Sequence, residues 1–223
     1  MDILARLDDE RRAINVLEHP FYQRWSAAEL SAAELRCYAA EYRHAVVALA
    51  RVSACAADDA AEDHRAGLWR HAEEEAAHVA LWDEFACATG ASRSALGGEP
   101  TLAQTRSCVE AWVGGEDLLE HLAVLYAIEA GQPEISRTKL DGLTAHYGFS
   151  DEGPATEYFR VHQLRDAEHA RQAADLITGL TAEIASPGQP VEKLVSRASA
   201  ALRGNWYLLD AVEQQARAPS LTS

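Results

Sequence analysis

The stretch HQLRDAEH, residues 162 to 169, decides how this part of the chain can fold, because its polar side chains recur at helical spacing. His162, Asp166 and His169 are spaced by four and then three residues, which places them on one stripe of an α-helix. Imidazole and carboxylate groups on one stripe form half of a metal site that suits iron, manganese or zinc. The alternative is a solvated polar face, since arginine and glutamate residues surround the stripe.

A second stretch, HAEEEAAHVALW (residues 71 to 82), has a similar pattern. His71 and His78 are seven residues apart, which is two helical turns, so they lie on the same face. Glu74 or Glu75 falls between them. A metal centre in a helical bundle takes its ligands from facing helices, and two stripes of this kind would supply them. A solvated, glutamate-rich helix is the alternative for this stretch.

Two further segments carry isolated ligand-type side chains. Glu129 ends the apolar run LAVLYAIE, and burial of an unpaired carboxylate is costly. Glu129 therefore lies either at the surface, near the following Gly-Gln-Pro, or beside a strong partner such as a metal ion. Glu41 and His44 in EYRH lie on an otherwise apolar helix. We expect an ordinary, partly buried pair there, although one or both could line the same cavity.

The whole chain has the composition and punctuation of an all-α protein. Alternating Val/Ile/Thr runs are nearly absent, whereas Ala, Leu, Glu and Arg are abundant. Ser31 and Glu34 form a capping box, and the proline after His19 ends the first helix. Further helices are predicted over residues 31–57, 58–89, 101–113, 116–130, 134–147, 151 or 154 to 180, and 191–215. We expect one domain, a bundle of seven to eight helices over residues 1–215, and a disordered tail over residues 216–223.

Composition and charge exclude several classes of function. The 223 residues carry a net charge of -15, which argues against a nucleic-acid partner or an anionic membrane surface. No run of about 18 apolar residues occurs, and the N-terminus lacks the layout of a signal peptide. The cysteines, at positions 37, 55, 87 and 108, form no CxxC pair. We therefore expect a reduced, cytoplasmic protein that acts on a small molecule.

In this order the motifs resemble the haem-oxygenase-like di-iron oxidases, and within them the CADD-like branch of 4-aminobenzoate synthases, which is related to PqqC and TenA. The segments that carry the resemblance are LEHPFYQRW (17–25), CYAAEYRHAVVALA (37–50), HAEEEAAHVALWDEFACATG (71–90), LYAIEAGQPEISRTKLDGL (125–143) and YFRVHQLRDAEHAR (158–171). The resemblance covers about residues 10 to 212. It implies a haem-oxygenase-like bundle, two metal ions (iron with iron, or iron with manganese), dioxygen as co-substrate, and a homodimer.

The resemblance also implies a set of metal ligands. Carried onto this chain, they are His78, Glu129, His162, Asp166 and His169. The sixth ligand of the family is a glutamate seven residues before the first of these histidines, and this chain has His71 there. Either His71 binds a metal itself, or Glu75 or Glu74 replaces the missing carboxylate, or one metal position is weakened. We favour Glu75 as a ligand, with His71 close to the metal or bound to it.

Members of the CADD-like branch make 4-aminobenzoate from their own side chains. In that branch a tyrosine supplies the ring and a lysine is implicated as the nitrogen donor. This sequence has the same residue types at the matching positions, Tyr22 and Lys139. Tyr38, Tyr126 and Tyr158 also stand at tyrosine positions of the family. A packed aromatic residue at position 22 and a surface lysine at position 139 are the alternatives.

Three classes of function therefore compete. The first is a dioxygen-dependent di-metal oxidase, either self-sacrificing or acting on a small amine or amino-acid-derived metabolite. The second is a cofactor-free enzyme like PqqC or TenA, for which Cys108 and Cys87 are nucleophile candidates by residue type alone. The third is a non-catalytic interaction module, which has no need of ligand-type residues inside a bundle.

Overall fold

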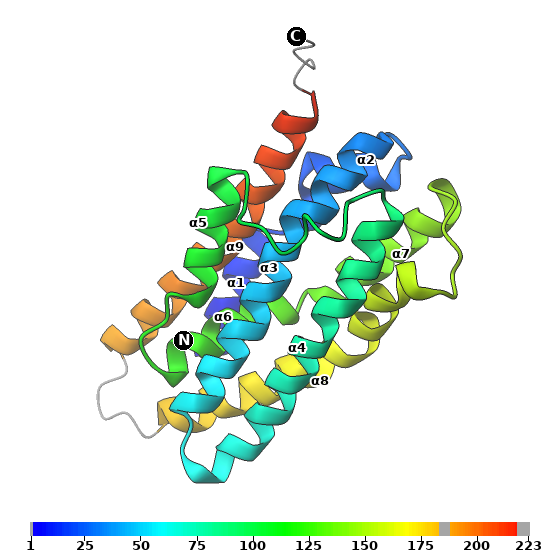
Figure 1. Ribbon diagram of the computed structural model, residues 1–223. Coiled ribbons are helices and arrows are strands. Elements are labelled where there is room, and N and C mark those ends of the chain that lie inside the picture. The colour runs from blue at the N-terminus through cyan, green and yellow to red at the C-terminus, as the bar shows by residue number, and fades with distance from the viewer. Residues whose placement is uncertain (1, 183–187, 218–223) are drawn as a thin grey trace.

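The computed structural model describes residues 2–182 and 188–217, and within these residues it contains helices and no strand (Figure 1). The all-α class is therefore confirmed. The helices are α1 (Ile3–Ala13), a short 3₁₀ helix (Val16–Glu18), α2 (Pro20–Ser26), α3 (Ala32–Asp59), α4 (Glu62–Ala88), α5 (Ala103–Val113), α6 (Leu118–Glu129), α7 (Gln132–His146), α8 (Pro154–Ala182) and α9 (Gly188–Arg217).

The N-terminal region contains two more helices than the sequence predicts, the short 3₁₀ helix and α2. Helix α1 ends at Ala13, and Pro20 begins α2 instead of only ending the helix before it. Proline suits the first position of a helix, because the N–H group that it lacks has no partner there in any case. The His19 side chain accepts a hydrogen bond from the Phe21 N–H and thereby caps α2.

The remaining helix boundaries lie within a few residues of those predicted. Helix α3 begins with the expected capping box between Ser31 and Glu34. At the other end of the chain, α9 continues through Arg217, so the first two residues of the predicted tail are helical. Residues 218–223, the rest of that tail, lie outside the described residues.

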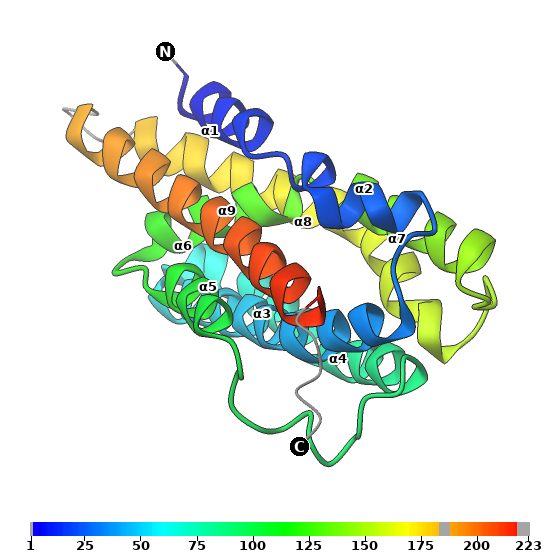
Figure 2. The ribbon, with the colours of Figure 1, turned by 90° about the horizontal axis from the view of Figure 1, so that it is seen from above.

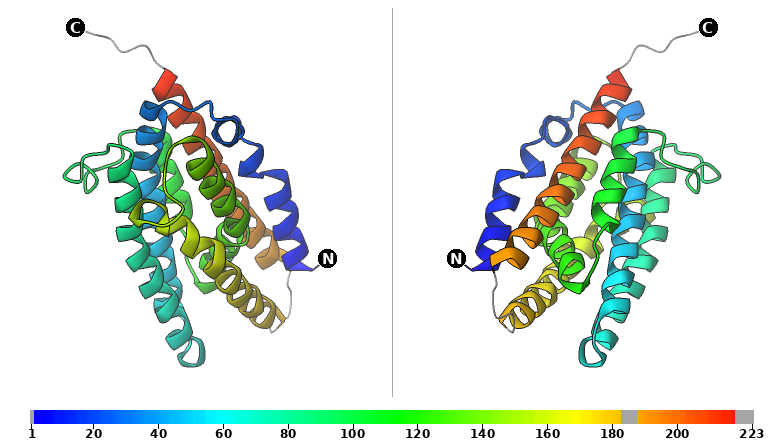
Figure 3. Two further views of the ribbon diagram at one scale, coloured as in Figure 1. Left: turned by 90° about the vertical axis from the view of Figure 1, so that its right-hand side faces the viewer. Right: turned by 90° about the vertical axis from the view of Figure 1, so that its left-hand side faces the viewer.

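The helices pack so that α4, α6 and α8 enclose one region of the bundle. Helices α3 and α4 run antiparallel along each other, and α8 crosses them at an angle (Figures 1 and 3). Helix α6 packs against both α8 and α9, and the view from above places α1 and α2 on the opposite side from α3 to α5 (Figure 2). The apolar core is rich in aromatic side chains, including Trp25, Trp82 and Trp112.

The pair Glu41 and His44 is structural, as the simpler of the two expectations had it. The Glu41 carboxylate accepts hydrogen bonds from the Thr101 N–H and the Thr105 hydroxyl, at 3.1 and 2.6 Å. The Glu41 carboxylate therefore holds the first turn of α5 against α3. His44 is half-buried. None of the described helices has a stretch long and apolar enough to cross a membrane.

Candidate metal centre

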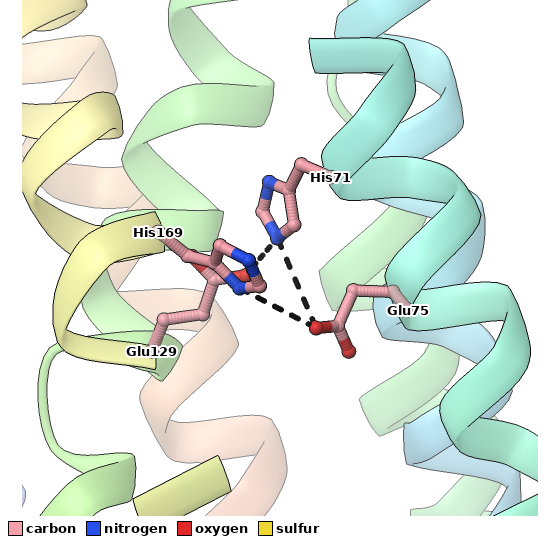
Figure 4. Close-up of side chains that lie close together, drawn as sticks. All are labelled: His71, Glu75, Glu129 and His169. Carbon is pink, nitrogen blue, oxygen red and sulfur yellow. Dashed lines mark ion pairs between the residues drawn. The ribbon is translucent and has the colours of Figure 1, made fainter. Parts of the chain in front are cut away.

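Buried ligand-type side chains converge where α4, α6 and α8 meet. They are His71, Glu75 and His78 of α4, Glu129 of α6, and His162, Asp166 and His169 of α8. Figure 4 shows four of them projecting toward one another from these three helices. All seven residues were predicted from the sequence as metal ligands. Their convergence is a feature of the structure, whereas their role as ligands stays a prediction.

Four of these residues form a first half-site, defined as His71, Glu75, Glu129 and His169. One ligand-type atom from each lies within 4.8 Å of the others. The His71 Nε2 atom is 2.7 Å from Glu129 Oε1 and 3.9 Å from Glu75 Oε1. The rings of His71 and His169 lie with their centroids 3.9 Å apart. His71 therefore points into the centre and can serve as a ligand there.

A second half-site consists of Glu75, His78 and His162, whose ligand-type atoms also lie within 4.8 Å of one another. His78 Nδ1 is 3.2 Å from Glu75 Oε1, and His162 Nε2 is 3.7 Å from Glu75 Oε2. Asp166 belongs to neither group, although it is fully buried and its Oδ1 lies 4.0 Å from His169 Nδ1. Asp166 is thus beside the half-sites rather than within one.

Glu75 is the residue common to both half-sites. Its Oε1 lies between the half-sites, 3.5 Å from His169 Nδ1 of the first and 3.2 Å from His78 Nδ1 of the second, while its Oε2 faces His162 of the second. A carboxylate can hold one metal with each oxygen, whereas an imidazole ring cannot bridge two ions in this way. The position of Glu75 therefore matches the replacement carboxylate that the sequence favours, and Glu74 lies on the outer side of the cluster.

The polar atoms in this cluster fit a bound cation. Each of the seven residues has at least one buried side-chain atom without a hydrogen-bond partner, and for Glu75, Glu129 and Asp166 both carboxylate oxygens are in this state. The atoms approach one another at ion-pair distances, but without hydrogen-bond geometry. Unsatisfied buried polar groups cost about 1–3 kcal/mol each, and more when charged. Converging lone pairs of imidazole and carboxylate are instead satisfied together by divalent metal ions.

Burial sets the protonation of the cluster. Burial lowers the pKa of His71, and burial together with the neighbouring His71 lowers the pKa of His169 to about 4. Both imidazoles are therefore neutral near pH 7, which is the form that binds metal. Burial and the charge of Glu75 raise the pKa of Glu129 and of Asp166 well above their ordinary values. Without a cation, these carboxyl groups cannot all be ionised together.

Contacts outside the cluster fix which ring nitrogens face inward. His162 Nδ1 lies 2.8 Å from the Tyr158 carbonyl oxygen, and because a carbonyl only accepts, Nδ1 carries the hydrogen and leaves the Nε2 lone pair facing Glu75. His169 Nε2 similarly contacts a Glu74 oxygen at 3.2 Å, so that Nδ1 faces the centre. Histidines that bind metal usually donate their other N–H to a carbonyl or carboxylate in this way.

A second cluster of predicted residues surrounds Lys139, at the end of the bundle formed by α2, α3 and α7. Lys139 is 1% exposed, so the alternative of a surface lysine is wrong. Its Nζ atom lies 5.2 Å from the centre of the Tyr22 ring and 5.6 Å from that of Tyr38. The Tyr22 and Tyr38 hydroxyls are 3.0 Å apart and hydrogen-bonded. Tyr158 stacks on His162, with ring centroids 3.9 Å apart, and thus adjoins the metal centre.

Other candidates from the sequence lie apart from both clusters. The Tyr126 hydroxyl donates a hydrogen bond to Asp8 of α1 at 2.9 Å. Cys108 is buried against Gly204 of α9, and burial raises the pKa of its thiol, which disfavours the reactive thiolate. Cys87 is half-buried near the end of α4.

Sequence reasoning missed three aromatic residues of the Lys139 cluster, and one of them, Phe159, has its ring centre 5.8 Å from the Lys139 Nζ atom. Tyr42 and Trp82 face the Lys139 Nζ atom, at 4.9 and 5.9 Å from their ring centres. Each has a signal in the sequence that could have found it. Tyr42 stands one helical turn after Tyr38, and Trp82 stands one turn after His78, so each shares a face with a residue already singled out.

Comparisons with known proteins agree with this architecture. The profile of the family described as iron-containing redox enzymes, a haem-oxygenase group, matches residues 36–202. The 4-aminobenzoate synthase of Chlamydia muridarum is 31% identical over 192 residues, which cover 81% of this chain and 80% of the relative. The 4-aminobenzoate synthase of Nitrosomonas europaea is 29% identical over 226 residues, covering 94% and 90%.

Solved structures show the same fold at lower sequence identity. A TenA homologue from Pseudomonas syringae pv. tomato has a TM-score of 0.83 at 18% identity, with 95% of this chain and 93% of that chain covered. A protein from Shewanella denitrificans with a haem-oxygenase-like fold has a TM-score of 0.75, also at 18% identity, with 96% and 93% covered. Because the family profile spans most of the chain, the protein belongs to the iron-containing redox enzymes of the haem-oxygenase-like fold.

Proposed function

We propose that this protein is a dioxygen-dependent, non-haem di-metal oxidase that converts its own Tyr22 side chain into 4-aminobenzoate, with nitrogen from Lys139. The names of its relatives support the product, since several are 4-aminobenzoate synthases at about 30% identity. The observation that carries the proposal is the placement of Lys139. Its amine is buried over the Tyr22 ring and is connected by aromatic contacts to the candidate metal centre.

The two half-sites would give each metal its own ligands. His71, Glu129 and His169 would hold one ion, His78 and His162 the other, and Glu75 would contact both. Two reduced ions, iron with iron or iron with manganese, would supply the electrons with which dioxygen is reduced. Glu75 and Glu129, with Asp166 buried beside them, would nearly balance the charge of two divalent ions, so these carboxyl groups would all be ionised only when the cluster is loaded.

The tyrosine side chain already contains the carbon skeleton of the product. Its ring carries one carbon, Cβ, opposite the phenol oxygen. Formation of 4-aminobenzoate requires that the Cα–Cβ bond breaks and that Cβ is oxidised to a carboxylate, with dioxygen as the oxidant and water as its reduction product. It also requires that the Lys139 nitrogen replaces the phenol oxygen, which leaves as water. Two-electron oxidation by dioxygen and hydrolysis then break the Nζ–Cε bond and leave Cε as an aldehyde. Tyr22 is buried, and its hydroxyl is held by Tyr38, so the ring is fixed and shielded from water.

The environment of Lys139 suits a nitrogen donor. Burial lowers its pKa to about 7, although the charge of Asp166 acts in the opposite direction. A substantial share of this lysine is therefore an uncharged amine near neutral pH, and the uncharged form is the nucleophile. Its Nζ atom lies against the faces of several rings, which attract the protonated form and keep it close to Tyr22.

A continuous series of aromatic contacts joins the metal centre to Tyr22. His162 stacks on Tyr158, whose ring centroid lies 4.7 Å from that of Trp82. Trp82 lies 5.8 Å from Tyr38, which shares a hydrogen bond with Tyr22. Oxidation that begins with the loss of an electron could thus reach Tyr22 without direct contact between its ring and dioxygen.

The test is mass analysis of the protein itself after exposure to dioxygen. Metal-free protein is loaded with Fe(II) alone, or with Fe(II) and Mn(II), exposed to oxygen, and mapped by peptide mass spectrometry. We expect mass loss at position 22, a modified Lys139, and 4-aminobenzoate that carries label from ring-labelled tyrosine and ¹⁵N-lysine. Tyr22→Phe should abolish the product, whereas Tyr126→Phe, a tyrosine outside the cluster, should not.

Two results would redirect the assignment. Oxygen consumption with an unmodified Tyr22 would refute the self-sacrificing reaction and favour oxidation of a separate small amine or amino-acid-derived metabolite. Protein that binds neither iron nor manganese would refute the di-metal oxidase and favour a cofactor-free enzyme or an interaction module.

A further inference from the structure

A small cavity lies on the far side of α6 from the metal centre, between α1, the start of α7 and α9. Its volume is about 180 Å³. That is roughly the liquid volume of six water molecules and less than the about 300–1,000 Å³ of drug-sized pockets. The lining includes Arg11 and Arg12 of α1, Ile128 of α6, Gln132 of α7, and Leu202 and Asn205 of α9. The cavity therefore suits a single small ring among apolar side chains.

The polar groups of this cavity differ at its two ends. Arg11 of α1 is partly exposed and Arg12 is exposed, and they pair with Asp8 and Asp9 at 2.8 and 2.6 Å. Together with the exposed Glu134 carboxylate, they mark the solvent side. Asn205 is 4% exposed, and its Oδ1 atom has no hydrogen-bond partner. An anionic group thus finds guanidinium donors at the mouth, and an N–H donor finds an unpaired acceptor deep inside.

The deep end of the cavity adjoins the Lys139 cluster. Gln132 and Asn205 both line the cavity and are both buried, and each donates a hydrogen bond to the Tyr42 phenol oxygen. The Tyr42 ring in turn lies 4.9 Å from Lys139 Nζ. A single layer of side chains therefore separates the cavity from the place where the amine and Tyr22 meet.

We propose that this cavity binds an aromatic carboxylate with an amine at the opposite end of one ring, the chemical class of the product. The carboxylate would pair with Arg11 and Arg12, the ring would lie against Ile128 and Leu202, and the amine would donate to Asn205 Oδ1. The identity of the ligand rests on the proposed function, whereas the cavity and its polarity do not. The site would hold the product outside the reaction chamber after Tyr42 and its partners shift.

The experiment measures binding of three probes to the purified full-length protein by ligand-detected NMR titration. The probes are 4-aminobenzoate, benzoate, which lacks the amine, and aniline, which lacks the carboxylate. We expect 4-aminobenzoate to bind several-fold more tightly than benzoate, and aniline most weakly. Arg11→Gln should weaken both carboxylates about tenfold, because it removes a charge-assisted hydrogen bond. Asn205→Leu should remove the advantage of 4-aminobenzoate over benzoate.

A matched control separates the cavity from nonspecific charge effects. Arg160 of α8 is also partly exposed and paired with a carboxylate three residues earlier, Glu157, but it lines no part of the cavity. Arg160→Gln should leave all three titrations unchanged. Circular dichroism shows whether Asn205→Leu folds. If it does not, the comparison of Arg11→Gln with Arg160→Gln still tests whether the cavity binds the carboxylate of the ligand.

Three outcomes would overturn the proposal: no saturable binding at millimolar 4-aminobenzoate, aniline bound as tightly as 4-aminobenzoate, or equal effects of Arg11→Gln and Arg160→Gln. Binding requires neither metal nor turnover, so this result is independent of the fate of Tyr22. Specific binding together with an unmodified Tyr22 would support the binding site and refute the self-sacrificing reaction. Modification of Tyr22 without specific binding would refute the binding site alone.

Discussion

Replacement of Lys139 by methionine should change how the stability of the metal-free protein depends on pH. Methionine keeps an unbranched side chain of similar length but cannot be protonated. Burial lowers the pKa of Lys139 to about 7, whereas a lysine in an unfolded chain has a pKa of about 10.4. Between these two values the unfolded chain holds a proton at this residue that the folded protein has lost.

The sign and size of the effect follow from this difference. Because burial lowers the pKa of Lys139 in the folded protein, the contribution of its neutral amine to the free energy of unfolding is complete only above about pH 10.4. That contribution is lost as the pH falls through about 7. Each pH unit in that window changes the free energy of unfolding by about 1.4 kcal/mol. Lys139 is still half protonated in the folded protein at pH 7, so the first pH unit contributes less than this slope. From pH 7 to pH 9, the wild-type protein should therefore gain about 2.3 kcal/mol relative to Lys139→Met.

Urea denaturation of both proteins at pH 7, 8 and 9 measures this difference. The comparison with the variant cancels other groups that titrate in the same range. Lys193→Met is the control, because Lys193 lies at the surface, and its hydrogen bonds to Glu120 and Glu116 raise its pKa, so it stays charged throughout. A difference between wild type and Lys139→Met that stays constant over these pH values would refute a neutral amine at position 139.

Three further changes test the metal centre and its connection to Tyr22. Glu75→Gln should lower the metal content from two ions to at most one, by elemental analysis, and two ions retained would contradict a shared ligand. Glu74→Gln should weaken metal affinity about 10- to 100-fold in chelator competition, since Glu74 orients His169, and unchanged affinity would exclude that role. Trp82→Phe should slow modification of Tyr22 at unchanged metal content, and an unchanged rate in the mass assay would rule out the aromatic connection.

The fold could be predicted largely from local signals. The capping box at Ser31 and the glycines and prolines between apolar runs fix most helix boundaries, because these residues act on the backbone within a turn or two. The exception is the region before Pro20. Proline can end one helix or begin the next, and the choice depends on whether a residue such as His19 supplies a cap.

The candidate site was predictable only one helix at a time. Spacing places His71, Glu75 and His78 on one face of α4, but it cannot tell which of them meet Glu129 and which meet His162. That pairing depends on the angles and offsets at which α4, α6 and α8 cross, which arise from packing over the whole bundle. The exclusion of Asp166 from both half-sites has the same origin.

The histidine at position 71 does not remove a carboxylate from the centre, but moves it. The resemblance implies three histidines and three carboxylates, and this cluster has Glu75, Glu129 and Asp166 with one histidine more. With Asp166 counted beside the two half-sites, a loaded two-metal site would therefore keep the same net charge after the replacement. Glu75 stands one turn closer to His78 than the family position, and there it contacts both half-sites. A chain that keeps this charge balance keeps the capacity for two divalent ions, so a weakened, single-metal site is the outcome that the geometry favours least.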